Sequence, residues 1–310
     1  MTPLKLITFP GAPNLPIFAA LERGYFAEAG IAPDLSHTPN SAYMAKELVA
    51  GAYQIGGTAF DNVVAYQEGQ GVAELSRAPD LFAFMGATQI ELSLVVAPEI
   101  ERYAQLKGKV IALDAVTTGF AFVLYRMLAN AGLGAGDYEF AAVGATPQRW
   151  EALKAGDAAG TITIEPFTSI ARANGFRVLE KSTDVLSSYQ GGCFAASRAW
   201  AAANPDTLKG FIAGYLEGLA WTLDPANRAA ASDLLIARMP QIKPGVVGSV
   251  MESLLSPRSG LTPHGAIVMA GVRTVLELRT TFGSESVPLT EPEKYIDLGH
   301  YNAVRAQMDR

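Results

Sequence analysis

The sequence has few of the residues on which redox or metal chemistry depends. Among its 310 residues are one cysteine, Cys193, and three histidines, His37, His264 and His300. A single cysteine cannot form an internal disulfide, and the widely spaced histidines do not form a metal-ligand motif. A catalytic thiolate would also need a base, which the sequence around Cys193 does not supply. We therefore expect no metal site and no cofactor, and we expect Cys193 to lie in the core or in a pocket wall, where it could touch a ligand.

Positive charge and long apolar runs are scarce as well. The chain has 24 Lys and Arg against 30 Asp and Glu, a net charge of -6 and a pI near 5.2. No cluster of basic residues is present, so we expect no nucleic-acid partner. No apolar run reaches the roughly 18 to 20 residues that a membrane span needs. With 49% hydrophobic residues, the chain can instead bury more than one core, which predicts two lobes.

Strand-like runs alternate with segments of helical periodicity. Strands are predicted near residues 4–9, 53–57, 109–113 and 160–164, and each precedes a helical pattern. This alternation predicts an α/β fold with mostly parallel sheets and helices on both faces. From about Ser197 the pattern is mainly helical. We expect one lobe from residues 1–88 and 196–310 and the other from residues 89–195, joined by extended segments around residues 89–96 and 188–195.

A short turn, Thr117-Thr118-Gly119, separates one predicted strand from its helix. Ligands of parallel sheets bind at the carboxyl ends of the strands, where helix N-termini offer N–H groups and a partial positive charge. Hydroxyl donors and a glycine fit a small anion there without Lys or Arg. The alternative is a simple helix cap.

Small polar residues recur at the same topological position in the other units. They are Asn14, Asn40, Ser41, Thr58 and Glu165. If the sheets face each other, these loops converge on one cleft, so we expect them to contact a ligand.

Aromatic residues lie beside several of these polar positions. Phe9, Phe60, Phe120 and Phe167 could form walls for a flat or partly apolar solute, or they could be ordinary core residues. A carboxylate in a closing cleft needs a donor or a cation, so Glu165 suggests a solute with an amine or ring N–H. The alternative for Glu165 is a carboxylate favoured by the helix dipole.

Several longer stretches carry a family resemblance. AALERGYFAEAGI (residues 19–31), ELVAGAYQIGGTAFDNVVAYQEGQG (47–71), LKGKVIALDAVTTGFAFVLYRMLANAGL (106–133) and WEALKAGDAAGTITIEPFTSIARANGFRVL (150–179) resemble the NMT1-like periplasmic substrate-binding proteins of sulfonate, taurine, nitrate and thiamine-pyrimidine importers. The resemblance covers roughly residues 4–225 and is weaker beyond them.

The resemblance implies a two-lobe type II periplasmic binding fold with two crossing strands and a ligand enclosed by hinge closure. It implies a membrane permease as partner, a monomeric receptor and a periplasmic location. By position, the family's ligand contacts fall on Phe9 and Asn14, on Thr58 to Asp61 (which includes Asp61 itself), near Gln89, on Thr117 to Phe120 and on Glu165. The N-terminal residues do not read as a secretory leader, so the resemblance also implies that a leader has been removed; otherwise the protein is cytoplasmic.

An enzyme on the same fold is the alternative function. Desulfinases, dehydratases of menaquinone biosynthesis and the fungal pyrimidine synthase have a similar architecture. The sequence shows no evident nucleophile and base pair and no cysteine-rich loop, so we expect a non-enzymatic receptor for a small organic anion or zwitterion. A sensory or interaction domain is a third reading, and it would be attached to signalling or membrane segments.

Overall fold

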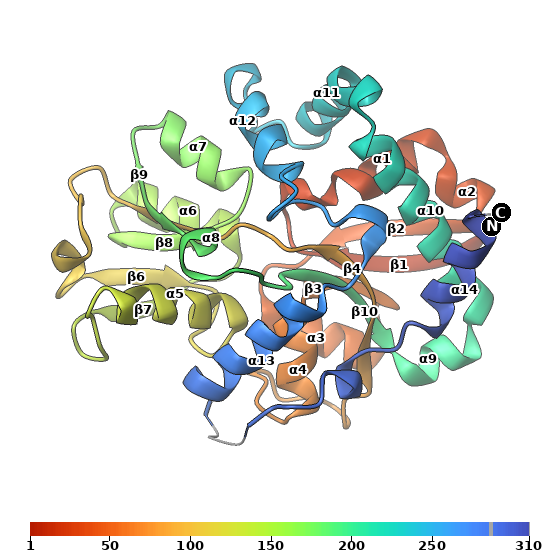
Figure 1. Cartoon of the computed structure of the whole chain (residues 1–310), viewed down its shortest axis with the longest axis horizontal. Coiled ribbons are helices and arrows are strands. Elements are labelled where there is room, and N and C mark those ends of the chain that lie inside the picture. Colours follow the sequence, from red (N-terminus) through yellow and green to blue (C-terminus); the bar gives the residue numbers. More distant parts are fainter. Residues whose placement is uncertain (285–287, 310) are drawn as a thin grey trace.

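The computed structural model describes residues 1–284 and 288–309 and arranges them as two α/β lobes, each built on a five-stranded sheet (Figure 1). The first sheet, on the right of Figure 1, has the strand order β2 (Ile31–His37), β1 (Thr2–Thr8), β3 (Ile55–Ala59), β10 (Gly192–Ser197) and β4 (Leu81–Thr88). The second sheet, on the left, has the order β7 (Glu139–Ala142), β6 (Val110–Leu113), β8 (Gly160–Thr163), β5 (Ser93–Val96) and β9 (Arg177–Lys181).

The two sheets share one pairing pattern. β1 pairs in parallel with β2 and β3, and β10 is antiparallel to β3 and β4. In the second sheet β6 pairs in parallel with β7 and β8, and β5 is antiparallel to β8 and β9. Parallel strands need crossover helices, whereas β5 and β10 enter their sheets directly after the chain passes between the lobes. The sheets are therefore mixed, with a parallel half on one side of each.

The chain passes between the lobes twice. It crosses at residues 89–92, between β4 and β5, and returns through residues 186–191, before β10. The segment 89–96, predicted as a lobe joint, contains the first crossing and β5, and the segment 188–195 contains most of the second crossing and the start of β10.

Helices cover both faces of the first sheet. They are η1 (Ala12–Asn14), α1 (Leu15–Arg23), α2 (Tyr25–Glu28), α3 (Ser41–Ala50), α4 (Phe60–Gln67), α9 (Arg198–Ala203), α10 (Pro205–Leu223), η3 (Pro225–Asn227), α11 (Arg228–Arg238) and α14 (Gly299–Met308). Gly51 ends α3 with a φ of 81°, a left-handed conformation that a glycine adopts without a Cβ clash. The apolar stripe of α10, including Leu208, Phe211 and Tyr215, is fully buried against this lobe.

The second lobe has fewer and shorter helices. They are η2 (Tyr103–Leu106), α5 (Gly119–Asn130), α6 (Thr146–Ala155), α7 (Phe167–Ala173) and α8 (Ser182–Val185). α5 buries Phe122, Leu124 and Met127 in this lobe.

The remaining C-terminal helices are α12 (Pro244–Leu254), η4 (Pro263–Gly265), α13 (Met269–Phe282) and η5 (Pro292–Tyr295). α12 and α13 contact both lobes near their boundary (Figure 1), whereas η4 packs on α10 and β4, and η5 packs on α4 and β4. α13 packs against both α4 and α5, and one hydrophobic cluster joins Phe60, Phe122 and Val275 from these three helices. The C-terminal part therefore braces both lobes, and the proposed assignment of residues 196–310 to the first lobe alone stays a prediction.

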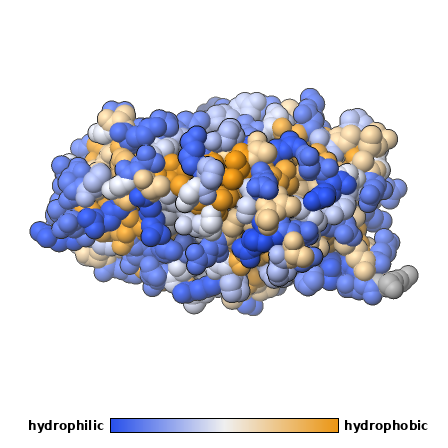
Figure 2. All heavy atoms as spheres, turned by 90° about the horizontal axis from the view of Figure 1, so that it is seen from above, coloured by the Kyte–Doolittle hydropathy of each residue, from blue (hydrophilic) through white to orange (hydrophobic). Residues whose placement is uncertain are grey.

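The face of the molecule seen in Figure 2 is mostly hydrophilic. Figure 2 shows one face on which hydrophobic residues reach the surface mainly in a patch near the middle, away from the ends of the molecule. In residues 1–284 and 288–309 no helix combines the length and the apolarity needed to cross a membrane.

Candidate functional site

A cavity of about 930 Å³, part of it open to solvent, lies between the lobes at the carboxyl ends of the parallel strands. The first lobe and its crossing segments contribute Phe9, Gly11, Pro13, Asn14, Ser41, Gly57, Thr58, Ala59, Asn62, Ala87, Thr88, Ile90, Gly191, Gly192, Cys193 and Phe194. The second lobe contributes Leu113, Asp114, Thr118, Gly119, Phe120, Thr146, Arg149 and Ile164. The cavity is thus assembled from the loops that the βα pattern brings together.

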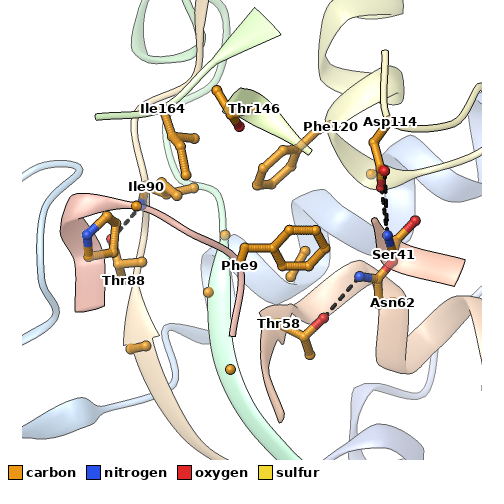
Figure 3. A pocket seen from close by; sticks show the side chains of 18 of the residues that line it. Phe9, Ser41, Thr58, Asn62, Thr88, Ile90, Asp114, Phe120, Thr146 and Ile164 are labelled. Carbon is orange, nitrogen blue, oxygen red and sulfur yellow. Dashed lines mark hydrogen bonds between the residues drawn. The ribbon is translucent and has the colours of Figure 1, made fainter. Parts of the chain in front are cut away.

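The labelled side chains form two groups on opposite sides of the cavity, and Thr88 lies with the isoleucines (Figure 3). Ser41, Asn62 and Asp114 lie on one side, and Ile90 and Ile164 lie on the other. The rings of Phe9 and Phe120, one from each lobe, point into the space between the two sides (Figure 3). An elongated solute with one polar end would match this division.

Several hydroxyl and amide groups at the cavity already have internal partners. Thr118 Oγ1 donates to the Ala115 carbonyl oxygen at 3.2 Å, and Asn14 Nδ2 donates to the Phe9 carbonyl oxygen at 2.8 Å. Thr118 can therefore offer a ligand only its lone pairs. Asn62 Nδ2 donates to Thr58 Oγ1 at 2.9 Å, which leaves the Thr58 O–H able to donate into the cavity.

Two buried groups at the cavity lack a partner. Ser41 Oγ and Arg149 Nε make no hydrogen bond within residues 1–284 and 288–309, and each residue is only 3% exposed. The rest of the Arg149 guanidinium is fixed, because Nη1 donates to the Ile162 carbonyl oxygen at 2.5 Å and Nη2 donates to Thr146 Oγ1 at 2.8 Å. A buried polar group without a partner costs about 1 to 3 kcal/mol, so a hydrogen bond to a ligand at either position would recover part of this cost.

Asp114 supplies the opposite charge. It follows β6 directly, is half-buried, and accepts the Ser41 backbone N–H through Oδ2 at 3.1 Å. Burial lowers the pKa of Arg149 to about 10, and the nearby Asp114 carboxylate opposes that shift. Arg149 therefore remains a cation at neutral pH.

Hydrogen bonds join the lobes at two places beside the cavity. At one place the Ala145 N–H donates to the Pro39 carbonyl oxygen at 2.9 Å, next to the Ser41–Asp114 bond. At the other the Ala12 N–H donates to the Glu165 carbonyl oxygen at 3.0 Å. These contacts hold the lobes together around the cavity.

The sequence-based site residues divide into two groups. Eight line the cavity: Phe9, Asn14, Ser41, Thr58, Thr118, Gly119, Phe120 and Cys193. Seven do not: Asn40, Phe60, Asp61, Gln89, Thr117, Glu165 and Phe167. As ligand contacts, the residues of both groups stay predictions.

Four of the seven have local structural roles. Asn40 caps α3 by accepting the Tyr43 N–H at 2.7 Å. Gln89 Oε1 accepts the Ser188 hydroxyl at 2.9 Å, between the two crossing segments. Phe60 and Phe167 belong to hydrophobic cores, which is the alternative that the sequence left open for them.

Asp61 and Thr117 belong to a buried ion-pair network centred on Arg279. The guanidinium donates to both Asp61 carboxylate oxygens, at 2.7 and 2.6 Å, to Gln70 Oε1 at 3.0 Å and to the Thr117 carbonyl oxygen at 3.1 Å. A Cβ at Gly119 would lie 2.5 Å from Asp61 Cβ, so the glycine allows this packing. The network ties α4 and α13 to the turn before α5.

Glu165 is half-buried just outside the cavity lining. Its carboxylate accepts the Ser169 hydroxyl at 2.9 Å and, more weakly, the Ser169 N–H at 3.3 Å. Desolvation by burial outweighs these bonds and raises the pKa of Glu165 to about 7.

Cys193 lies on β10 in the cavity wall. Burial raises the pKa of its thiol, which disfavours the nucleophilic thiolate. Among the described residues that line the cavity there is no histidine to act as its base. The part of the chain that the structure describes also contains no group of three or more His, Cys, Asp or Glu side chains arranged to hold a metal ion.

Arg149 and Asp114 are charged residues that line the cavity and are not among the site residues predicted from the sequence. Asp114 could have been found, because it is a polar residue immediately after a buried strand. Arg149 could not, because it lies in the first turn of α6 and resembles a surface arginine in the sequence. Only the packing of α6 on β8 shows that it is buried.

Comparison with known proteins agrees with this architecture. A model of the NMT1-like family matches residues 1–236. The chain belongs to the NMT1-like family. No curated protein sequence matches the chain.

Three solved structures illustrate the fold of this NMT1-like protein. The alkanesulfonate-binding protein SsuA from Xanthomonas axonopodis pv. citri, bound to MOPS, is 18% identical with a TM-score of 0.75, covering 96% of this chain and 98% of that one. The periplasmic nitrate-binding protein NrtA from Synechocystis PCC 6803 is 11% identical with a TM-score of 0.80, covering 100% and 89%. A cysteine-to-serine variant of DszB in complex with biphenyl-2-sulfinic acid is 13% identical with a TM-score of 0.65, covering 98% and 99%. These matches confirm the predicted periplasmic binding fold.

Proposed function

We propose that the protein is the solute-binding receptor of an ABC-type importer and that it encloses a small organic anion or zwitterion between its lobes by hinge closure. The observation that carries this proposal is the cavity itself, whose two walls come from different lobes. A ligand that touches both walls favours the closed arrangement by its differential contacts. The neighbours SsuA and NrtA, named for sulfonate and nitrate binding, support the receptor role.

The partners and the location follow from this role. We propose a membrane permease that recognises the closed receptor, a periplasmic location and a monomeric receptor. The cavity chemistry supports binding without catalysis, because Cys193 is a buried neutral thiol and the charged groups at the cavity are fixed by hydrogen bonds.

The first test is the identification of a bound solute. Native mass spectrometry of the purified protein would show any co-purified small molecule, and a thermal-shift panel of sulfonates, aromatic carboxylates and pyrimidines would rank the candidates by mass action. We expect at least one candidate to raise the melting temperature without being chemically changed.

The second test is closure. Small-angle scattering should show a smaller radius of gyration with saturating ligand than without it. An unchanged radius at saturation would contradict hinge closure, and conversion of the ligand to a product would favour an enzyme related in fold to DszB.

A further inference from the structure

Two opposite charges face the cavity from the second lobe. The hydrogen bonds of Arg149 go to neutral partners, the Ile162 carbonyl oxygen and the Thr146 hydroxyl. Asp114 accepts the backbone N–H of Ser41, which is also neutral. Each charge therefore keeps part of its bonding capacity for a ligand.

The hydrogen bonds that these groups can still form are of two kinds, donated and accepted. Arg149 Nε–H and the Ser41 hydroxyl lack partners in the described residues, and both are donors. Each atom is buried, so an acidic oxygen reaches it only if the cavity wall shifts as the ligand binds. The Asp114 carboxylate has lone pairs beyond those that Ser41 uses and can only accept. The site thus offers donors for an acid group and a negative acceptor for a nitrogen that carries hydrogen.

The charges of Arg149 and Asp114 indicate whether the ligand is a simple anion or a zwitterion. A simple anion would neutralise Arg149 but would leave a second negative charge beside Asp114 in a closing, poorly solvated cavity. A zwitterion pairs with both charges and leaves none uncompensated. The half-buried Asp114 lies at the rim, since it also lines a second depression outside the Ser41–Asp114 bond.

The rest of the cavity defines the body of the ligand. Phe9 and Phe120 point into the space beside the polar groups, and Ile90 and Ile164 lie on the far side (Figure 3). An aromatic or branched apolar group of the ligand would bury apolar surface against these side chains, whereas a polar chain would not.

We infer that the ligand is an amino acid or amino sulfonate with an aromatic or branched apolar body, whose acid group binds Arg149 and Ser41 and whose ammonium binds Asp114. This inference rests on the proposed receptor function and deepens it. The nitrogen partner is Asp114, in place of Glu165, which lies outside the cavity lining.

Matched ligands test the two charges separately. Phenylalanine, 3-phenylpropanoate and 2-phenylethylamine share one ring and differ only in their charged groups. Leucine with 4-methylpentanoate, and 3-aminopropane-1-sulfonate with propane-1-sulfonate, extend the comparison to other bodies and to sulfonates. Binding is measured by isothermal titration calorimetry. We expect each zwitterion to bind more tightly than its analogues. The analogue without the amine should bind about tenfold more weakly or worse, because a hydrogen-bonded charge pair is removed.

Two variants assign the charges to residues. Asp114→Asn keeps the shape and the Ser41 contact, and it should weaken the best zwitterion about tenfold while changing its des-amino acid less than about twofold. Ser41→Ala removes a hydroxyl that has no partner among the described residues, and it should weaken both ligands equally. Asp137→Asn, at a partly exposed carboxylate of the same lobe, is the matched control and should change neither.

The outcomes separate this inference from the receptor function. If a des-amino acid binds as tightly as its zwitterion, if Asp114→Asn weakens both equally, or if a co-purified molecule lacks either charge, the inference is overturned and the receptor remains. If no small molecule co-purifies and no ligand of any class binds, the receptor function fails, and the inference fails with it.

Discussion

Two buried arginines show how the same side chain can serve the fold or the cavity. Arg279 is 1% exposed and Arg149 is 3% exposed. All three guanidinium nitrogens of Arg279 have partners, including the bidentate Asp61 carboxylate, and the group lies 4.9 Å from the centre of the Phe122 ring. Arg149 has only neutral partners and an unused Nε among the described residues. The difference is that every guanidinium nitrogen of Arg279 has a partner, whereas Arg149 Nε has none among the described residues and is the nitrogen that we propose for a ligand.

The largest effect should come from breaking the saturated site. Arg279→Met leaves the Asp61 carboxylate buried without its cation and frees the Thr117 carbonyl, which should lower the free energy of unfolding by about 3 to 5 kcal/mol. Urea unfolding followed by circular dichroism measures this change. Arg273→Met, on the exposed face of the same helix, is the control and should cost less than about 0.5 kcal/mol.

The coupling between the two partners can be measured directly. Asp61→Asn combined with Arg279→Met removes both charges, so the double variant should lose clearly less stability than the sum of the single losses. Additive losses would show that Asp61 and Arg279 act independently and would contradict the bracing role.

The site residues show how much of the cavity could be predicted from the sequence. Phe9, Thr58 and Thr118 lie at the cavity because a βα turn places its residues at the carboxyl end of a strand, which periodicity alone reveals. Asp61 occupies an equivalent position in the sequence. Its partner Arg279 is 218 residues away in the sequence, and no local sequence pattern indicates that the two residues pair.

The fold was more predictable than the site for the same physical reason. Strand and helix periods are local, so β6 and β8 lie within about one residue of the strands predicted near residues 109–113 and 160–164. The antiparallel insertion of β5 and β10 and the packing of α13 on both lobes depend on long-range contacts. Such contacts leave no periodic signal in the chain.

Glu165 is a carboxylate without a cationic partner, so it extends the comparison to the pH dependence of stability. Unlike Asp61, Glu165 is held only by Ser169, and its pKa is raised to about 7 from the ordinary 4.5 by burial. Because the folded pKa is the higher one, its contribution to stability is complete below about pH 4.5 and is lost as the pH rises through about 7. The loss is at most about 3 kcal/mol, and less where solvent reaches the half-buried group.

Glu165→Gln should remove this dependence. Between about pH 4.5 and 7 the wild-type protein should lose stability relative to the variant as the pH rises, which urea unfolding at a series of pH values would show. Glu99→Gln, at an exposed position of the same lobe, is the control. Parallel curves for wild type and Glu165→Gln would mean that the Glu165 carboxyl ionises normally in the folded protein.

The unsaturated arginine should matter less for stability than for binding. Arg149→Met leaves the Ile162 carbonyl and the Thr146 hydroxyl without a donor, a loss of about 1 to 3 kcal/mol, which is smaller than that for Arg279→Met because no ion pair is broken. Ligand affinity, measured by calorimetry on the folded variant, should fall by at least about tenfold. Arg172→Met, at an exposed position of the second lobe, is the control. Unchanged affinity would remove Arg149 from the site.

The smallest effect is expected at Cys193, a buried group that is neutral at physiological pH. The thiol lines the cavity, and burial raises its pKa, so it contributes a small apolar surface and no nucleophile. Cys193→Ala should cost about 1 kcal/mol of stability and change ligand affinity by less than about threefold. The decisive measurement is mass spectrometry of ligand incubated with wild type and variant: intact ligand in both supports a receptor, whereas a product that forms only with wild type would make Cys193 the centre of a reaction. That result would reverse the comparison, because the working group of the cavity would then be the thiol and not the unsaturated cation.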